Sequence, residues 1–281
     1  NHLSGRIEAL DLTLLGERST AGHASVVARE TNAVFDRITV RMVTTGAEWL
    51  ETTVTLPQQT KQVLIENRLL KIGIAEKESV YFAFPFAVDD TDPDYAITGG
   101  VTSLDAPHVP GSAEHMFAIR DWVAMRDEHG AAAWVTVDAP LIELQNIAIP
   151  YAPFPNSIPG THHRRSTIYS WALNNIWDTN FPTQQRGELV FRYAVGSGGD
   201  VDQRLLGIET AAAVVSPPIA HCLRATDAPE LPVRTSLLTV SNPLVEVVHL
   251  SPGDRDDTVT AVLLSLASEP VTVEITAPAM V

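Results

Sequence analysis

The sequence predicts an all-β protein built as a large antiparallel β-sandwich. Short runs of apolar residues alternate with polar ones at a period of two, which is typical of half-buried strands. Gly, Pro, Asn or Asp residues bound each run. No segment keeps apolar residues at helical spacing over three turns, and 19 prolines are spread along the chain. So many strands with so few helices must pack sheet on sheet to cover their apolar faces.

The expected strands follow one another along most of the chain. The clearest alternation places Val80, Phe82, Phe84 and Phe86 on one face of a strand, where they should form part of the core. We expect strands at 37–42, 50–56, 62–70, 80–86, 189–195, 258–266 and 271–275.

Two long stretches are predicted to be irregular because of their proline and aspartate content, Asp89–His115 and Pro150–Arg165. A proline-rich connection begins at Ser216. We therefore divide the chain into a large sandwich domain, residues 1–215, and a small C-terminal β unit, residues 216–281.

Charge and hydropathy argue against nucleic acid and membranes as partners. The formal net charge of −15 disfavours nucleic acid and anionic lipid, because both carry negative charge themselves. No apolar run approaches the roughly 18 residues that span a bilayer. The chain begins at Asn1 without an initiator Met or a signal-like segment, and we expect a piece of a longer, cytoplasmic protein whose own N-terminus would decide on export.

Histidines offer little support for a metal site. His162 and His163 are adjacent, so in extended chain their side chains would point in opposite directions. His108 and His115 are separated by a Pro-Gly turn. A zinc site needs three or four convergent ligands, and we favour solvated loop histidines over a metal site.

Carboxylates could instead support glycoside hydrolysis, in which one acid protonates the leaving group and a second attacks or activates water. Asp121, Asp127, Glu128 and Asp138 occur close together in the sequence. However, Asp127-Glu128-His129-Gly130 is also a natural chain reversal. We favour the interpretation that these carboxylates form a hairpin turn, and we assign no catalytic residue.

The most unusual stretch is SWALNNIWDTNFP, residues 170–182. Asn side chains both donate and accept hydrogen bonds, and an indole face can stack on the C–H surface of a sugar ring. The composition is therefore that of a neutral polyol site, contributed by Trp171, Asn174, Asn175, Trp177, Thr179 and Asn180. The alternative is that the tryptophans are core residues and the asparagines cap turns, and the residues alone leave both readings open.

Several segments together resemble one known family. KQVLIENRLLK (61–71) leads into ESVYFAFPFAV (78–88), and TIYSWALNNIWDTNFPTQQRGELVFRYAV (167–195) contains the Asn-Asn pair. SGRIEALD (4–11) and DDTVTAVLLSLASEPVTVEI (256–275) extend the likeness toward both ends. In this order they resemble the C-terminal β region of glycoside hydrolase family 38, the α-mannosidases.

The resemblance implies a galactose mutarotase-like supersandwich in a retaining α-mannosidase-like enzyme. The family's catalytic Asp and its zinc lie on an N-terminal α/β domain that is followed by a helical bundle, and nothing in this sequence matches those elements. We therefore expect a non-catalytic domain with no cofactor of its own, with zinc on the missing catalytic domain. Its partners would be the N-terminal domains of the same chain and an α-mannoside. The implied substrate-facing residues are Asn174, Asn175, Trp177, Thr179 and Asn180.

Two other functions remain open at this stage. A free-standing carbohydrate-binding module would bind mannose or oligomannose by itself, and replacing Trp177 would weaken that binding. An autonomous enzyme of the mutarotase or lyase type would need a His and a Glu on one concave face. Glu143 and the His162-His163 loop are the pairing that the sequence offers for it.

Overall fold

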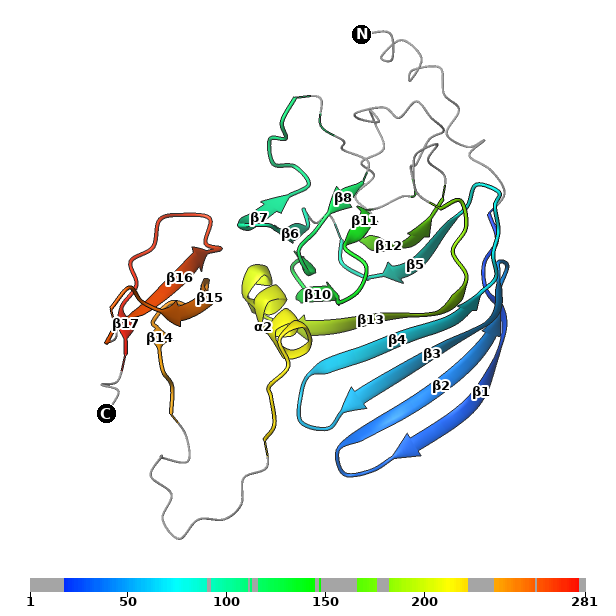
Figure 1. Ribbon diagram of the computed structural model, residues 1–281, viewed down its shortest axis with the longest axis horizontal. Coiled ribbons are helices and arrows are strands. Elements are labelled where there is room, and N and C mark those ends of the chain that lie inside the picture. Colours follow the sequence, from blue (N-terminus) through cyan, green and yellow to red (C-terminus); the bar gives the residue numbers. More distant parts are fainter. Residues whose placement is uncertain are drawn as a thin grey trace.

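Two antiparallel sheets lie face to face in the computed structural model of this chain (Figure 1). The structure describes residues 18–89, 92–110, 112, 116–144, 147, 166–175, 182–221, 235–255 and 257–277. Within these residues the larger sheet has nine strands, in the order β1 (Gly22–Thr31), β2 (Phe35–Val43), β3 (Ala47–Pro57), β4 (Gln62–Lys71), β13 (Gly187–Gly198), β10 (Ala131–Thr136), β9 (Trp122–Arg126), β6 (Asp94–Ile97) and β7 (Gly100–Ser103).

The smaller sheet and two C-terminal strand pairs complete the described strands. The smaller sheet has the order β5 (Ser79–Pro85), β12 (Thr167–Asn174), β11 (Leu141–Leu144) and β8 (Phe117–Ala118). Near the C-terminus, β14 (Thr239–Val240) pairs with β17 (Ile275–Thr276), and β15 (Val245–Pro252) pairs with β16 (Val259–Ser265). The predicted all-β antiparallel sandwich is confirmed.

An aromatic layer fills the space between the two sheets. The ring centroid of Phe84, on β5, lies 4.8 Å from that of Tyr193 and 5.3 Å from that of Trp134, both on the larger sheet. Phe82 lies 5.7 Å from Phe191. Ala83, between the two phenylalanines, is exposed. The alternation predicted for this strand is therefore confirmed, and apolar burial on one face holds the sheets together.

Most of the expected strands are present, and two predictions were wrong. The stretch 271–275 has strand structure only from Ile275, because its partner β14 is two residues long. Asp89–His115 is not irregular throughout, since β6 and β7 form a hairpin within it, with Gly99 at the turn in a left-handed conformation of φ +83°. The irregular stretch predicted at Pro150–Arg165 lies outside the described residues.

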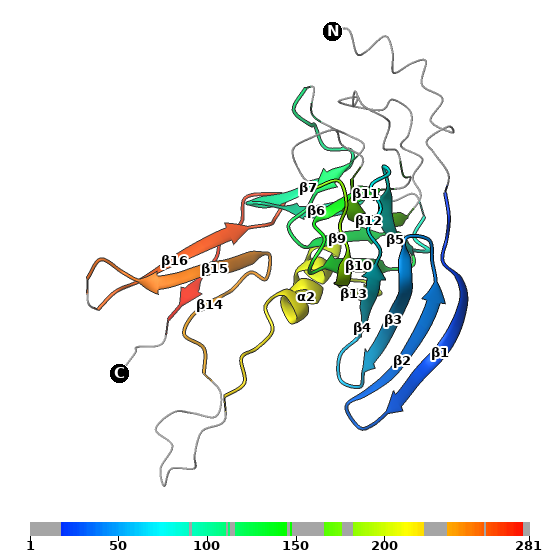
Figure 2. The ribbon, with the colours of Figure 1, turned by 45° about the vertical axis from the view of Figure 1, so that its right-hand side comes forward.

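A helix, α2 (Gln203–Val215), was not predicted. The side chain of Asp202 caps it by accepting from the amides of Arg204 and Leu205 at 2.9 and 3.0 Å. The helix covers the outer face of the larger sheet over β9, β10 and β13 (Figures 1 and 2). Three of its five buried residues are small or polar, namely Gly207, Thr210 and Ala211, which is why its buried face shows no apolar stripe in the sequence.

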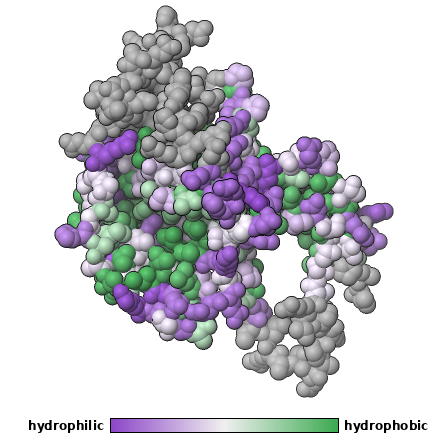
Figure 3. Space-filling view, turned by 180° about the vertical axis from the view of Figure 1, so that it is seen from behind, coloured by the Kyte–Doolittle hydropathy of each residue, from purple (hydrophilic) through white to green (hydrophobic). Residues whose placement is uncertain are grey.

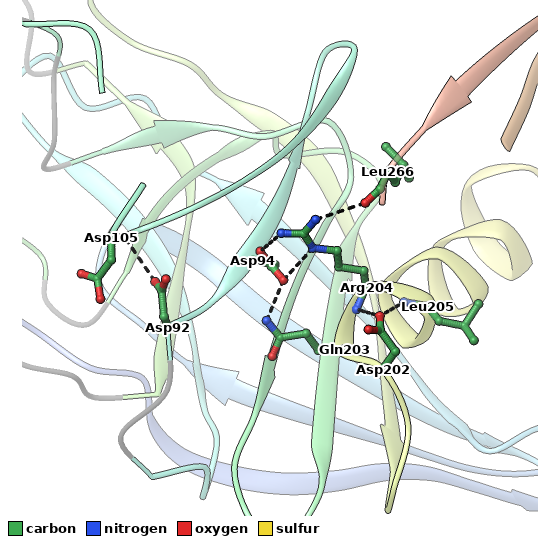
Figure 4. A network of polar contacts seen from close by, with 8 residues as sticks. All are labelled: Asp92, Asp94, Asp105, Asp202, Gln203, Arg204, Leu205 and Leu266. Atoms are coloured by element: carbon green, nitrogen blue, oxygen red, sulfur yellow. Dashed lines mark hydrogen bonds and ion pairs between the residues drawn. The ribbon is translucent and has the colours of Figure 1, made fainter. Parts of the chain in front are cut away.

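The C-terminal strands contact this helix and the larger sheet. Leu266, directly after β16, is 1% exposed and packs in a second apolar cluster with Trp122 and residues of α2. Arg204 binds both oxygens of Asp94 at 2.9 Å and donates to the Leu266 carbonyl at 3.2 Å (Figure 4). Arg120 and Glu246 form a further ion pair at 3.0 Å. The boundary predicted near Ser216 coincides with the helix C-cap, and the division into two domains stays a prediction.

Replacement of Gly207 by Ala tests the close packing of α2. A Cβ at this position would lie 2.6 and 2.7 Å from ring carbons of the fully buried Trp122. Overpacking of this kind costs about 1–3 kcal/mol, which should exceed the roughly 1 kcal/mol that Ala gains over Gly in a helix. We expect the free energy of unfolding, measured by urea titration, to fall. Gly199→Ala is the control, because no atom lies within 4 Å of its added Cβ; equal stability of both variants would contradict the prediction.

Candidate functional site

The polar segment singled out in the sequence begins where β12 ends. Asn174 is the last residue of β12 and pairs with Ser79 of β5, and Asn175 follows it directly. The other predicted sugar-facing residues, Trp177, Thr179 and Asn180, lie outside the described residues. The structure therefore places the base of the segment, and the substrate-facing role of all five residues stays a prediction.

The carboxamide of Asn175 connects three pieces of backbone. Its Oδ1 accepts from the Glu78 amide at 2.6 Å. Its Nδ2 donates to the carbonyl oxygens of Ile74, Glu76 and Thr183 at 3.1, 2.9 and 2.7 Å. The backbone amide of Asn175 also donates to the Glu78 carbonyl at 3.0 Å. Because the amide nitrogen carries two hydrogens, one of them is shared between two of the three carbonyl oxygens, and the whole group is engaged in fixing this loop.

A buried lysine, Lys71, also contacts this loop. The Nζ of Lys71, whose side chain is 2% exposed, lies 2.5 Å from Oε1 of Glu78 and donates to the Ile72 carbonyl at 2.9 Å. A buried ammonium group is tolerated only when it is paired and hydrogen-bonded. Lys71 and Asn175 thus hold the 72–78 connection against the end of β12 from two sides.

Next to this loop, aromatic side chains gather on the outer face of the smaller sheet. Tyr81 stacks on Trp171 with ring centroids 6.0 Å apart and meets the edge of Tyr169 at 6.5 Å. Its hydroxyl donates to Oε1 of Glu143 at 2.6 Å. Burial, followed by the charge of Glu143, raises the pKa of Tyr81. The pair is thus a neutral phenol bonded to a fully buried glutamate.

The opposite face of β5 and β12 points into the core. Residues 169–171 of β12 therefore place side chains both on the outer face of the smaller sheet and in the core. Ser170, between Tyr169 and Trp171, is fully buried and bonds the Tyr193 hydroxyl at 2.9 Å across the sandwich. Burial raises the pKa of Tyr193. Trp171, at 4% exposure, is a packed residue, which agrees with the core alternative for that tryptophan.

The carboxylates considered for hydrolysis have structural partners. Asp127 accepts from the amides of Asp89, His129 and Gly130, and these hydrogen bonds lower its pKa; its hairpin-turn role is confirmed. Arg192 binds both oxygens of Asp138 and lowers the pKa of that carboxyl. Burial raises the pKa of Asp121, against the opposing effect of its ion pair with Arg120.

The described His, Cys, Asp and Glu residues do not form a metal site. His108 contacts the Leu104 carbonyl through Nε2 at 3.3 Å, whereas His115, His162 and His163 lie outside the described residues. Over the described ranges, no three His, Cys, Asp or Glu side chains converge as metal ligands would. In the same part of the chain, no helix combines the length and apolar character needed to cross a bilayer.

Sequence reasoning missed Tyr81, Tyr169 and Lys71. Tyr81 occupies an outward position between Val80 and Phe82, and its partners come from β11 and β12, whose pairing the sequence does not reveal. The one available signal was the presence of two aromatic residues at outward positions of two strands that both adjoin the polar segment.

Comparison with known proteins identifies solved structures that share this architecture. No known protein family and no curated protein matches the sequence. Among solved structures, a protein in glycosyl hydrolase family 38 from Enterococcus faecalis is similar with a TM-score of 0.66 and 13% identity, covering 92% of this chain and 32% of its own. An alpha-mannosidase from Enterococcus faecalis V583 is similar with the same TM-score, identity and coverage of this chain, and with 31% of its own length covered. The chain therefore spans about a third of these proteins, and the resemblance seen in the sequence is confirmed at the level of the fold.

Two substitutions of Asn175 test its role as a donor. Asn175→Ala removes all contacts of the carboxamide, whereas Asn175→Asp keeps an acceptor for the Glu78 amide but turns a carboxylate toward three carbonyl oxygens. Each should lower the free energy of unfolding by about 1–3 kcal/mol, because several hydrogen bonds, each worth about 0.5–1.5 kcal/mol, are lost together. Relative to the unsubstituted chain at the same pH, the loss with Asp should be smaller near pH 4, where a protonated carboxyl can donate. Full stability of Asn175→Asp at pH 7 in denaturant titration would refute the donor role.

Proposed function

We propose that this chain is the C-terminal, non-catalytic β domain of an α-mannosidase-like retaining glycoside hydrolase, in which it helps to shape the sugar pocket. The observation that carries the proposal is the fold match to two Enterococcus faecalis proteins, which covers 92% of this chain but only 31–32% of theirs. The sequence likeness around the Asn-Asn segment points in the same direction. A cytoplasmic location belongs to the same proposal.

The proposed contribution of this domain is geometric. Asn175 and the Lys71–Glu78 ion pair fix the point from which residues 176–180 leave β12. From that base, the indole of Trp177 would stack on the apolar face of a sugar ring. Thr179 and Asn180 would exchange hydrogen bonds with sugar hydroxyls. Asn174 and Asn175 would form the base of this substrate-facing segment, and the Asn175 carboxamide, which is engaged with the backbone, would also position it.

The chemical step would take place on the missing catalytic domain. Retaining hydrolysis requires two carboxyl groups that flank the scissile bond, and the carboxylates of Asp127 and Asp138 in this chain are engaged in turn and ion-pair contacts. No convergent set of metal ligands occurs in the described residues, so they do not fit a zinc site. In the proposed enzyme, zinc would be bound by the catalytic domain and would polarise the substrate there.

Activity measurements on two lengths of protein test this proposal. We expect the 281-residue chain to show no hydrolysis of a chromogenic α-mannoside, with or without added zinc, and the N-terminally extended protein to be active. The reason is that the acid and the nucleophile would reside upstream. Hydrolysis by the 281-residue chain would overturn the proposal and return attention to Glu143, with its bound Tyr81, as part of an autonomous site.

The sugar-facing role of the segment has a separate test in the extended protein. Trp177→Ala should lower kcat/KM by roughly 3- to 10-fold, the value of one lost aromatic contact. Trp49→Ala is the control, because Trp49 faces the outer surface of β3 beneath the guanidinium of Arg41, 5.4 Å from its ring. Equal kinetics for the two variants would argue against a sugar contact at Trp177. Titration of the 281-residue chain with oligomannose separates the remaining alternative, since tight binding that Trp177→Ala abolishes would indicate a free-standing carbohydrate-binding module.

A further inference from the structure

The larger sheet extends well past the smaller one. Contacts between the sheets run from Phe82 on Phe191 at one side to Phe117 on Tyr95 at the other. The edge of the smaller sheet on the first side is β5, which lies over β13. Strands β1, β2 and β3 continue beyond that edge (Figure 2). We define the inner face of the larger sheet as the face that points toward the smaller sheet at β13. On β1 to β3, no described strand of the smaller sheet lies above this face.

Strand register identifies the residues of this inner face. Residues directly opposite each other in neighbouring strands lie on the same side of a sheet. From the core residue Phe191 the pairing runs through Asn67, Thr52 and Val40 to Val26. On β1 to β3 the apolar residues of the inner face are Ala24, Val26, Ile38, Val40, Met42, Leu50, Val54 and Leu56. The same pairing also places Arg29, Thr31, Asp36 and Thr52 on this face, so it is largely apolar with polar residues among them.

Much of this inner face is accessible. Val26 and Leu56 are each 48% exposed, and Ile38, Val40 and Val54 are only half-buried. Figure 3, which shows the molecule from behind, has a broad apolar area over the strands that lie at the right of Figure 1. Contiguous apolar surface of this kind marks an interaction site in a folded protein.

The outer face of the same strands is different. Arg41 binds Glu51 at 2.6 Å, and the hydroxyls of Thr39 and Thr53 bond each other at 3.0 Å. Arg37 donates to Thr55 at 3.0 Å. The polar side chains of this face are paired with one another, as expected of a surface that is exposed to water. The contrast between the faces indicates that the inner one is built to be covered.

We propose that the inner face of β1 to β3 is the docking surface for the polypeptide that precedes this chain in the longer protein. This inference rests on the proposed function. The similar Enterococcus faecalis proteins are about three times as long as the matched region, so the upstream part is large enough to form a cover. β1, which carries part of this surface, is the described strand nearest in sequence to that upstream polypeptide.

The chemistry of the surface fits a permanent partner within the same chain. Most of its central side chains are aliphatic, as in obligate interfaces, which resemble a divided core, and the hydroxyl of Thr52 among them donates to Asn67 at 2.6 Å. Within the described part of the chain, β5 pairs only with β12. A strand of the upstream polypeptide placed beside β5 would extend the smaller sheet over β1 to β3. It would then bury the apolar face in the layer where the sandwich already has its core.

Paired cysteine probes on β1 test the proposal. Val26 and Ser25 are neighbours on one exposed strand, and their side chains lie on the inner and outer faces respectively. Val26→Cys and Ser25→Cys are each made in a Cys222→Ser background, which removes the single natural cysteine. The rate of maleimide labelling is then measured in the 281-residue chain and in the N-terminally extended protein.

We expect both probes to react at comparable rates in the 281-residue chain. In the extended protein the Val26→Cys variant should react at least about tenfold more slowly, because labelling would require the docked interface to open, while Ser25→Cys keeps its rate. Equal rates for Val26→Cys in both proteins would overturn the proposal. Concentration-dependent protection in the 281-residue chain, with none in the extended protein, would identify a second copy as the occupant and would also overturn it.

Two further readouts keep the test decisive. Amide hydrogen exchange of β1 to β3 in the two unsubstituted proteins gives the same comparison without cysteine substitutions, and slower exchange in the extended protein is the expected result. Mannosidase activity of the extended sample is measured in parallel. Protection of Val26→Cys without activity would uphold the docking surface and reject the proposed enzyme function, whereas activity without protection would do the reverse.

Discussion

The packing of one aromatic layer between two sheets of unequal size is the constraint on which the rest of the structure depends. Phe82 and Phe84 on β5 meet Phe191, Tyr193 and Trp134 on the larger sheet. Because side chains alternate along a strand, fixing these rings inward also fixes which residues face outward. Tyr81 is thereby directed to the outer face of the smaller sheet, where it meets Trp171 and Glu143.

The same constraint explains why the polar loop needs such complete hydrogen bonding. β5 and β12 are held by their inward residues, so the connection at 72–78 and the end of β12 have to meet at a fixed distance. Irregular backbone at that junction carries carbonyl groups that no strand satisfies. The Asn175 carboxamide satisfies Ile74, Glu76 and Thr183, and Lys71 satisfies Ile72. The polar residues at the base of the segment are therefore part of the architecture, which is what the support of the proposed sugar-facing segment would require.

What could be predicted from the sequence follows from how local each signal is. Strands such as β4, β5 and β13 show their own alternation, so period and punctuation were sufficient to find them. Helix α2 was not predicted because its buried face depends on the contact of Gly207 with Trp122, a residue about 85 positions earlier in the chain. The Asn175 contacts with residues 74–78 are likewise non-local. An Asn-Asn pair in a sequence cannot distinguish a sugar ligand from a backbone clamp, since the chemistry of the amide is the same in both roles.

The two faces of β1 to β3 extend this reasoning from single residues to the whole chain. A sheet that is polar and internally paired on one side and aliphatic on the other is typical of an element with one solvent-facing surface and one buried surface. In the described part of the chain, the smaller sheet covers the inner face over β13 but not over β1. The fold match covers nearly the whole chain and only about a third of the similar proteins. The proposed docking of upstream polypeptide on β1 to β3 would bury this accessible apolar face and complete the layer between the sheets.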